Sequence, residues 1–175
     1  MRSFESKSVD LKLRPVVAAD REFLLNVYAA TRADEMAMVP WSEEQKREFV
    51  EMQFNAQDTF YRDQFKDAAF QIVELGSRPI GRLYVDRRPD ELRVIDIALL
   101  SEQRGKGIGG RLMQDVIDEA AILGKKVGIH VERSNPAMRL YERLGFTKVE
   151  DQGVYWLMEW APGVALESKP TADEH

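Results

Sequence analysis

The amino-acid sequence predicts an α/β (α+β) fold with a mixed central sheet of about seven strands and helices on both faces. Three observations carry this prediction. Short apolar runs bounded by turn residues alternate with amphipathic helical patterns. One strand–helix–strand stretch is long enough to require a parallel pair of strands. The other neighbouring strands are joined by short turns, which indicates antiparallel hairpins.

Length and composition agree with one domain that buries its own core. The chain has 175 residues, of which 44% are hydrophobic and 31% charged, and its net charge is −5. The negative charge argues against a nucleic-acid or anionic-membrane partner. We find neither an apolar run of about 18 residues nor an N-terminal signal segment. The absence of cysteine excludes disulfides and a cysteine nucleophile, and it favours a cytoplasmic protein.

The first part of the chain predicts a strand followed by two helices. Leu11 and Leu13 alternate with charged residues until Pro15 ends the run, which is typical of an edge strand. Asp20 can cap a helix. The apolar face of that helix comprises Phe23, Leu24, Val27, Tyr28 and Thr31. Residues 32–41 show no clear period, and then Ser42 and Gln45 form a capping box that opens a second helix through about residue 55.

The second part begins with three predicted strands at 70–73, 80–85 and 92–100, of which the last is apolar on both faces and therefore central. The elements that follow are a helix over 108–123, a strand over 127–131, a helix over 136–144 and a hairpin over 146–160. The full order is β-αα-βββ-α-β-α-ββ. We expect an N-terminal extension at 1–10, a single domain at 11–160 and a polar C-terminal tail at 161–175.

The stretch from Gln103 to Gly110 is where the chemistry is expected. It holds four glycines within six residues and lies between the central strand and a well-patterned helix. Glycine reaches positive φ and lets a ligand approach the backbone closely. The N-terminus of a helix presents free N–H groups and the positive end of its dipole, which favours phosphate. Arg104 and Lys106 add positive charge at the same place.

Two other phosphate-binding patterns fit this stretch less well. Gly105 and Gly110 have the spacing of a Walker A loop, but Arg111 and Leu112 replace its lysine and hydroxyl residue. A dinucleotide fingerprint matches Gly105, Gly107 and Gly110 literally, with an acid about 20 residues further on. However, four polar residues separate the strand from the first glycine, and too little chain follows for the second half of a doubly wound domain. An NAD(P)-binding protein is therefore the weaker alternative.

The stretch resembles the acyl-CoA loop of the GNAT N-acetyltransferase superfamily, Arg/Gln-x-x-Gly-x-Gly/Ala, with Arg104, Gly107 and Gly109 in register. A second stretch, from Asn135 to Phe146, is similar to the family's Asn-x-x-Ala-x-x-Leu-Tyr-x-x-x-Gly-Phe signature. Its alanine lies one place early, at Ala137, and Met138 takes the usual slot. The resemblance is specific over residues 92–160.

The resemblance implies an enzyme that transfers the acetyl group of acetyl-CoA to a primary amine by direct attack in a ternary complex, without a metal. It also implies that the parallel strands splay apart beyond the loop and admit the pantetheine arm. The residues expected to bind the co-substrate are Leu99, Leu100, Arg104, Gly105, Lys106, Gly107, Ile108, Gly109, Gly110 and Asn135. Of these, Leu99 is expected to polarise the thioester carbonyl through its backbone amide.

Two residues are expected to be catalytic. Tyr141 matches the motif tyrosine that reaches the CoA sulfur, and it is our candidate acid, although its place on an apolar stripe also suits a core aromatic. Asp96 is our candidate base, because a carboxylate inside an apolar strand is costly and such groups recur at active sites. The structural alternative for Asp96 is an ion pair with Arg82 or Arg93.

Other candidates are weaker. Glu91, Asp86 and Glu132 are substitute bases, and His130 is a strand histidine that is more typical of packing than of catalysis. Asn135 also suits a plain helix cap before Pro136. The weak acceptor-contact candidates are Met36, Met38, Trp41 and Tyr61. The partner is expected to be a small-molecule or peptide amine. A non-catalytic acyl-CoA-binding module stays open as an alternative, and the edge strands would allow a homodimer.

Overall fold

The computed structural model describes residues 10–163, and these residues form seven strands, four α-helices and two short 3-10 helices. The strands are β1 (Leu11–Pro15), β2 (Ala69–Leu75), β3 (Arg78–Arg87), β4 (Glu91–Leu99), β5 (Lys126–Glu132), β6 (Thr147–Gln152) and β7 (Tyr155–Trp160). The helices are α1 (Arg21–Ala37), α2 (Glu43–Gln64), α3 (Ile108–Leu123) and α4 (Met138–Arg143), with 3-10 turns η1 (Ala18–Asp20) and η2 (Ser101–Gln103). None of the described helices is long and apolar enough to cross a membrane.

The strands form one mixed sheet in the order β1-β2-β3-β4-β5-β7-β6, which confirms the predicted fold class. β1 pairs with β2, β2 with β3, and β7 with both β5 and β6, all antiparallel. β4 and β5 are parallel, as predicted, with Glu91 opposite Lys126 and Val94 opposite Ile129. β1 lies at one edge and β4 in the middle of the order, as their sequence patterns indicated.

Contacts divide the chain into two compact units, which among the described residues are 10–86 with 95–109 and 87–94 with 110–163. The single domain over 11–160 stays a prediction. Residues 1–9 of the expected extension and residues 164–175 of the expected tail lie outside the described part.

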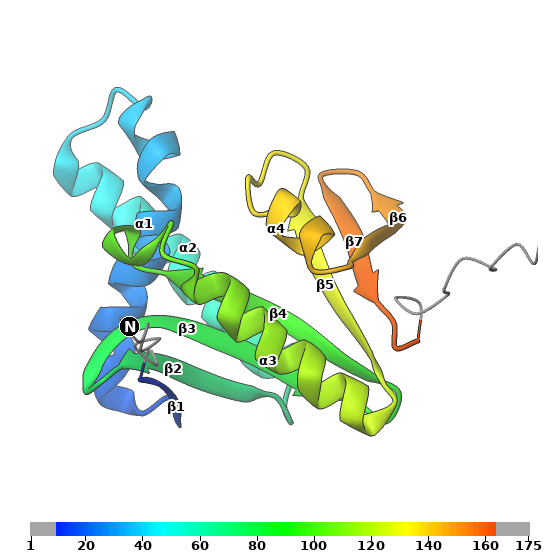
Figure 1. The fold of residues 1–175 in the computed structure, drawn as a ribbon. Coiled ribbons are helices and arrows are strands. Elements are labelled where there is room, and N and C mark those ends of the chain that lie inside the picture. The colour runs from blue at the N-terminus through cyan, green and yellow to red at the C-terminus, as the bar shows by residue number, and fades with distance from the viewer. Residues whose placement is uncertain (1–9, 164–175) are drawn as a thin grey trace, which may run out of the picture. The chain divides into compact units, whose positions relative to one another are not determined.

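In the first unit, α1 and α2 pack together over β2 (Figure 1). Each helix contributes two side chains, four residues apart, to one buried cluster, as an amphipathic helix does. The buried cluster comprises Leu24 and Tyr28 of α1, Val50 and Phe54 of α2, and Ile72 of β2. The rings of Tyr28 and Phe54 lie 5.9 Å apart. These contacts fix α2 on the sheet, and α2 then carries polar side chains toward β3 and β4.

In the second unit, α3 buries the predicted apolar stripe, and β6 and β7 form a hairpin whose inner strand pairs with β5 (Figure 1). The buried α3 residues of this unit are Leu112, Met113, Val116, Ile117 and Ala120. All six residues of β6 are exposed, and the register of β6 shifts between Lys148 and Glu150. A bulge with charged side chains is a device that protects an edge strand from further pairing.

Helix α2 is longer than the sequence pattern predicted. It continues past residue 55 to Gln64, because its inward face continues through Gln57 and Tyr61, which bond to Arg82 and Asp96. An ion pair between Asp58 and Arg62, four residues apart, supports the added turns. Helix α1 likewise continues through Ala37, where the sequence shows no clear period.

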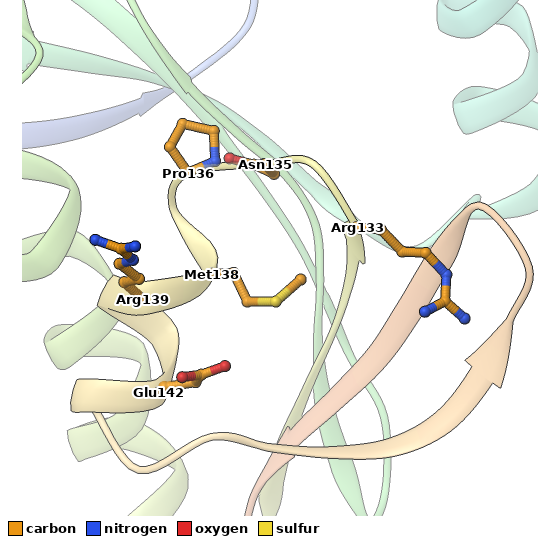
Figure 2. A pocket seen from close by; sticks show the side chains of 6 residues that line it. All are labelled: Arg133, Asn135, Pro136, Met138, Arg139 and Glu142. Carbon is orange, nitrogen blue, oxygen red and sulfur yellow. The ribbon is translucent and has the colours of Figure 1, made fainter.

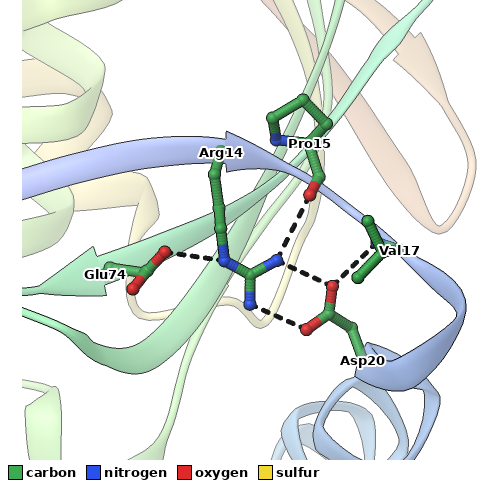
Figure 3. Close-up of polar contacts among 5 residues, drawn as sticks. All are labelled: Arg14, Pro15, Val17, Asp20 and Glu74. Carbon is green, nitrogen blue, oxygen red and sulfur yellow. Dashed lines mark hydrogen bonds and ion pairs between the residues drawn. The ribbon is translucent and has the colours of Figure 1, made fainter.

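Arg14 ties β1, β2 and the η1 turn together (Figure 3). Its two Nη atoms donate to the two carboxylate oxygens of Asp20 at 2.8 Å each, and its Nε lies 2.6 Å from Glu74 Oε1. Asp20 also accepts a hydrogen bond from the backbone N–H of Val17 at 2.8 Å and is buried. The bonds from Arg14 hold the pKa of Asp20 below its usual value against the opposing effect of burial. The carboxylate is therefore charged at neutral pH.

We predict that Asp20→Asn lowers the free energy of unfolding by about 2–3 kcal/mol at pH 7, because Arg14 loses a bidentate partner in a largely buried setting. The folded pKa of Asp20 lies below its unfolded value of about 3.9. The contribution of Asp20 is therefore fully present above that value and is lost as the pH falls through the folded pKa. Urea unfolding of both proteins from pH 7 downward measures this, and the difference between them should shrink in acid.

Asp10→Asn is the matched control, since Asp10 forms an ion pair with Lys12 whose side chains are both exposed. Such pairs contribute little. Equal losses for the two variants, or a loss for Asp20→Asn that does not depend on pH, would contradict the prediction.

Candidate functional site

Strand β4 leads directly into the glycine-rich loop. Leu99, its last residue, is buried, and the next residue, Leu100, donates its backbone N–H to Ile80 O of β3 at 2.9 Å. Successive backbone amides of a strand point to opposite edges. Because the amide of Leu100 points toward β3, the amide of Leu99 points to the other edge of β4. The expected role of Leu99 stays a prediction.

The loop itself has the backbone of a ligand cradle. Gly105 and Gly107 have φ angles of 74° and 80°, in the left-handed region that favours glycine. A Cβ placed on either glycine would meet no heavy atom of the described residues within 4 Å. The residues from Arg104 to Gly107 are all exposed. The loop backbone is therefore exposed to solvent at Gly105 and Gly107, the two residues whose positive φ favours glycine.

Helix α3 begins immediately after Gly107. It has 16 residues, starting at Ile108, so its first N–H groups lack helical acceptors and carry the positive end of a full helix dipole. The side chain of Ile108 is buried and anchors the start of the helix. Gly110 is partly buried, and a Cβ there would lie 3.4 Å from Leu140. Together the loop and the helix start can hold an anion, with Arg104 and Lys106 exposed nearby.

Asp96 lies in a polar network beneath α2. Its Oδ2 accepts a hydrogen bond from Arg82 Nη2 at 2.6 Å and another from the Tyr61 hydroxyl at 3.2 Å. The same Arg82 nitrogen lies 2.9 Å from Gln57 Oε1. The side chain of Arg82 is only 3% exposed and that of Asp96 15%. The ion pair with Arg82 that the sequence offered as the structural alternative is therefore present, whereas Arg93 pairs with Glu91.

The charge of Arg82 is maintained inside the protein. Burial lowers the pKa of Arg82, but the Coulombic attraction of Asp96 together with the contributions of Tyr84 and Tyr61 outweighs this effect, and the net shift is upward. Tyr84 lies beside this pair, with the Arg82 guanidinium 5.1 Å from its ring centre. Burial raises the pKa of Tyr84, so its hydroxyl is neutral at pH 7. The ion pair of Arg82 and Asp96 thus lies beside the phenol side chains of Tyr61 and Tyr84.

The second unit contains Tyr141 and Asn135, the two expected site residues of the second family motif. Tyr141 is buried in α4, and its ring lies 5.9 Å from that of Phe146. Asn135 follows β5, and its Oδ1 accepts a hydrogen bond from the backbone N–H of Ala137 at 2.9 Å. Residues 135–137 therefore form a capped turn, and α4 starts at Met138 rather than at Pro136. The side-chain amide N–H groups of Asn135 are not used by this cap, and they can serve a ligand.

A hollow of about 510 Å³ lies beside Asn135 (Figure 2). Its lining comprises Arg133, Asn135, Pro136, Met138, Arg139 and Glu142. Figure 2 shows Met138, in the slot where the family motif has alanine, pointing into the space between α4 and Arg133. Arg133 is held by the β6–β7 hairpin, because it contacts Asp151 and Gly153 O and stacks 4.3 Å from the Trp156 ring centre. These contacts hold the Arg133 side chain in place at one side of the hollow.

The weaker candidate bases are one buried, ion-paired glutamate and two half-buried acids at strand ends. Glu91 is buried against Arg93, at 2.9 Å, and Arg88, at 3.6 Å. Asp86 and Glu132 are half-buried at the ends of β3 and β5. His130 lies 3.4 Å from Arg93 Nη1, and burial together with that positive charge lowers its pKa, so it is neutral at pH 7.

Among the acceptor-contact candidates, Met38 is 88% exposed, and Trp41 packs edge-on against Phe49 at 5.3 Å. Met36 packs against the buried cluster of the first unit, and Tyr61 reaches Asp96. Sequence reasoning missed Gln57 because the predicted α2 ended before it. It also missed Gln103, which is buried in the loop with no partner for its Oε1 among the described residues. No sequence signal marks Gln103.

Comparison with known proteins identifies one protein family whose model matches this chain. The model of the acetyltransferase (GNAT) family matches residues 30–146. Mycothiol acetyltransferase of Corynebacterium glutamicum is 34% identical over 96 residues, which are 53% of this chain and 33% of that protein. The match thus spans a third of the length of that relative.

Solved structures agree on the fold. PaiA N-acetyltransferase from Thermoplasma acidophilum, in complex with coenzyme A, gives a TM-score of 0.65 at 20% identity over 86% of this chain and 98% of that one. Spermidine N-acetyltransferase from Vibrio cholerae, in complex with CoA and spermine, gives a TM-score of 0.59 at 22% identity over 86% of this chain and 95% of that one. The family model covers most of the chain, and the mixed seven-stranded sheet and the glycine loop before α3 agree with it. We conclude that this protein belongs to the GNAT acetyltransferase family.

Proposed function

We propose that this protein is an acetyl-CoA-dependent N-acetyltransferase that passes the acetyl group directly to a primary amine in a ternary complex. One observation carries the proposal: two exposed glycines with left-handed backbone open a 16-residue helix, in a chain of the acetyltransferase family. The pyrophosphate of acetyl-CoA would bind the backbone N–H groups from Gly105 to Gly110. Arg104 and Lys106 would add charge, and Asn135 would contact the pantetheine arm.

The chemistry needs three groups. The amine nitrogen attacks the thioester carbonyl carbon, the carbon–sulfur bond breaks, the amine loses a proton and the thiolate gains one. The backbone N–H of Leu99 would stabilise the oxyanion of the tetrahedral intermediate. A thiol has a pKa of about 8.5, so the departing sulfur benefits from an acid, and we assign this role to Tyr141.

Asp96 is the proposed base for the amine, whose pKa is about 10.4 if it is an alkyl amine. Both described partners of Asp96 bond to Oδ2, which leaves Oδ1 for the proton. Asp96 and Leu99 are three residues apart in one strand, which is about 10 Å at the rise of a β-strand. The proton would therefore travel through water rather than directly from the attacking nitrogen.

Location and partners are part of the same proposal. The acceptor is a small-molecule or peptide amine, in line with the spermidine N-acetyltransferase that shares the fold. We propose a cytoplasmic location, which suits a chain without cysteine, and no nucleic-acid partner, which suits the net charge of −5. A homodimer through the sheet edges is compatible with this function.

We predict that Gly107→Ala weakens acetyl-CoA binding at least tenfold, by about 1.4 kcal/mol or more, because a methyl group enters the proposed phosphate cradle and the left-handed backbone becomes strained. Gly153→Ala is the matched control. Gly153 has a φ of 79°, against 80° for Gly107, but lies in the β6–β7 turn. Both variants should lose similar stability, whereas only Gly107→Ala should lose affinity in a calorimetric titration. Equal affinities for the two variants would contradict the proposal.

We predict that Tyr141→Phe lowers turnover about 100-fold or more, while acetyl-CoA binding stays unchanged, because the proposed proton donor to the sulfur is lost. Release of the CoA thiol with an amine panel of spermidine, lysine and a peptide with a free N-terminus measures turnover. Tyr155→Phe, on a partly exposed tyrosine of β7, is the control and should have no effect. Unchanged turnover in Tyr141→Phe would remove Tyr141 as the acid.

We predict that Asp96→Asn lowers kcat/KM about 100-fold, because amine deprotonation loses its acceptor. This change also leaves the buried Arg82 without its counter-charge, so the folded fraction must be measured by circular dichroism. Tyr61→Phe removes one of the two hydrogen bonds to Asp96 Oδ2 and should keep most of the activity. Wild-type rates in folded Asp96→Asn would show that another group, or water alone, is the base.

A further inference from the structure

Gly81 of β3 lies unusually close to the end of β4. A Cβ added to Gly81 would be 2.3 Å from Ala98 O, 2.7 Å from Leu99 Cδ2 and 3.1 Å from Leu99 Cα. Two of these three atoms belong to the backbone, so a side-chain rotation cannot relieve the contact. The absence of a side chain at Gly81 therefore allows β4 to take its position against β3.

The atom nearest to Gly81 belongs to a particular peptide group. Ala98 O and the N–H of Leu99 are part of the same peptide, and in a trans peptide these two groups point in opposite directions. No described residue has a cis peptide bond. Because Ala98 O faces Gly81, the Leu99 N–H points away from β3. The hydrogen bond from Leu100 N to Ile80 O fixes the peptide that follows.

We propose that Gly81 is a positioning residue that sets the place of the Leu99 amide, and thereby the ability of the protein to distinguish acetyl-CoA from CoA. This inference rests on the proposed function, in which the Leu99 amide donates to the thioester carbonyl. Acetyl-CoA has that carbonyl and CoA does not. Any side chain at residue 81 would push the Ala98–Leu99 peptide along the direction of its N–H.

The expected displacement is large enough to matter. To reach even the 3.0 Å that real Cβ contacts respect, Ala98 O must move by about 0.7 Å from its distance of 2.3 Å. Preorganised donors act over a narrow range of distance, and misplacement of a reacting group by about 1 Å can cost about 100-fold in rate. If Gly81 had only a structural role, its replacement would weaken the binding of acetyl-CoA and CoA equally, or would weaken neither.

The test is a calorimetric titration of the full chain with acetyl-CoA and with CoA, for wild type and Gly81→Ala. We expect Gly81→Ala to weaken acetyl-CoA binding about three- to tenfold, the worth of one hydrogen bond, and CoA binding less than about twofold. Gly128→Ala is the matched control, a buried glycine of β5 where a Cβ would meet Glu91 Oε1 at 2.0 Å and Arg93 Nε at 3.0 Å. Because those atoms are ends of flexible side chains, the ratio of the two affinities should stay at its wild-type value.

An unchanged affinity ratio in folded Gly81→Ala would overturn the inference while leaving the proposed function intact. If wild type binds neither ligand, the proposed function itself fails. Should Gly81→Ala not fold, the wild-type protein labelled with ¹⁵N-leucine provides a second measurement. The Leu99 amide proton should shift downfield with acetyl-CoA relative to CoA, and identical shifts with the two ligands would also overturn the inference.

Discussion

The close approach of β3 and β4 at Gly81 is the constraint on which the first unit depends. It sets the Ala98–Leu99 peptide in place, and the bond from Leu100 to Ile80 then ends the strand in a defined direction. Only after this point does the chain enter the loop, where Gly105 and Gly107 take left-handed backbone and α3 begins. The proposed donor at the end of β4 and the proposed anion site at the start of α3 thus follow one another along about ten residues.

The buried ion pair of Arg82 and Asp96 adds a second constraint to the same strand. A buried charge pair is costly to desolvate, and replacement by apolar residues is often neutral or stabilising. Asp96 lies in the otherwise apolar stretch 94–99 of β4, and this favours a functional reason over a purely structural one. Tyr61 and Gln57 connect this pair to α2, so the helix that would border an acceptor is joined by hydrogen bonds to the proposed base. Acceptor binding and proton removal would then be coupled through one helix.

The sequence predicted the order of helices and strands along the chain, the parallel pair and the glycine-rich loop, because these depend on local periodicity and on glycine spacing. It offered Arg82 as a partner of Asp96 but could not choose it over Arg93, since that choice depends on which strands neighbour each other. It could not single out Gly81, because a glycine in an apolar strand shows no sign of the backbone facing it. The extra turns of α2 were missed because Gln57 and Tyr61 bury polar atoms, which an apolar stripe does not reveal.

Amine-dependent release of CoA thiol from acetyl-CoA tests the central claim most directly. The chain has no cysteine, so a thiol reagent reports only the CoA that is formed. The account predicts thiol release that requires both the protein and an amine, with an equal amount of acetylated amine found by mass spectrometry. Saturable acetyl-CoA binding without release for any primary amine would contradict it and would indicate a binding module instead. Binding of NADH with no response to acetyl-CoA would return the loop to the dinucleotide alternative.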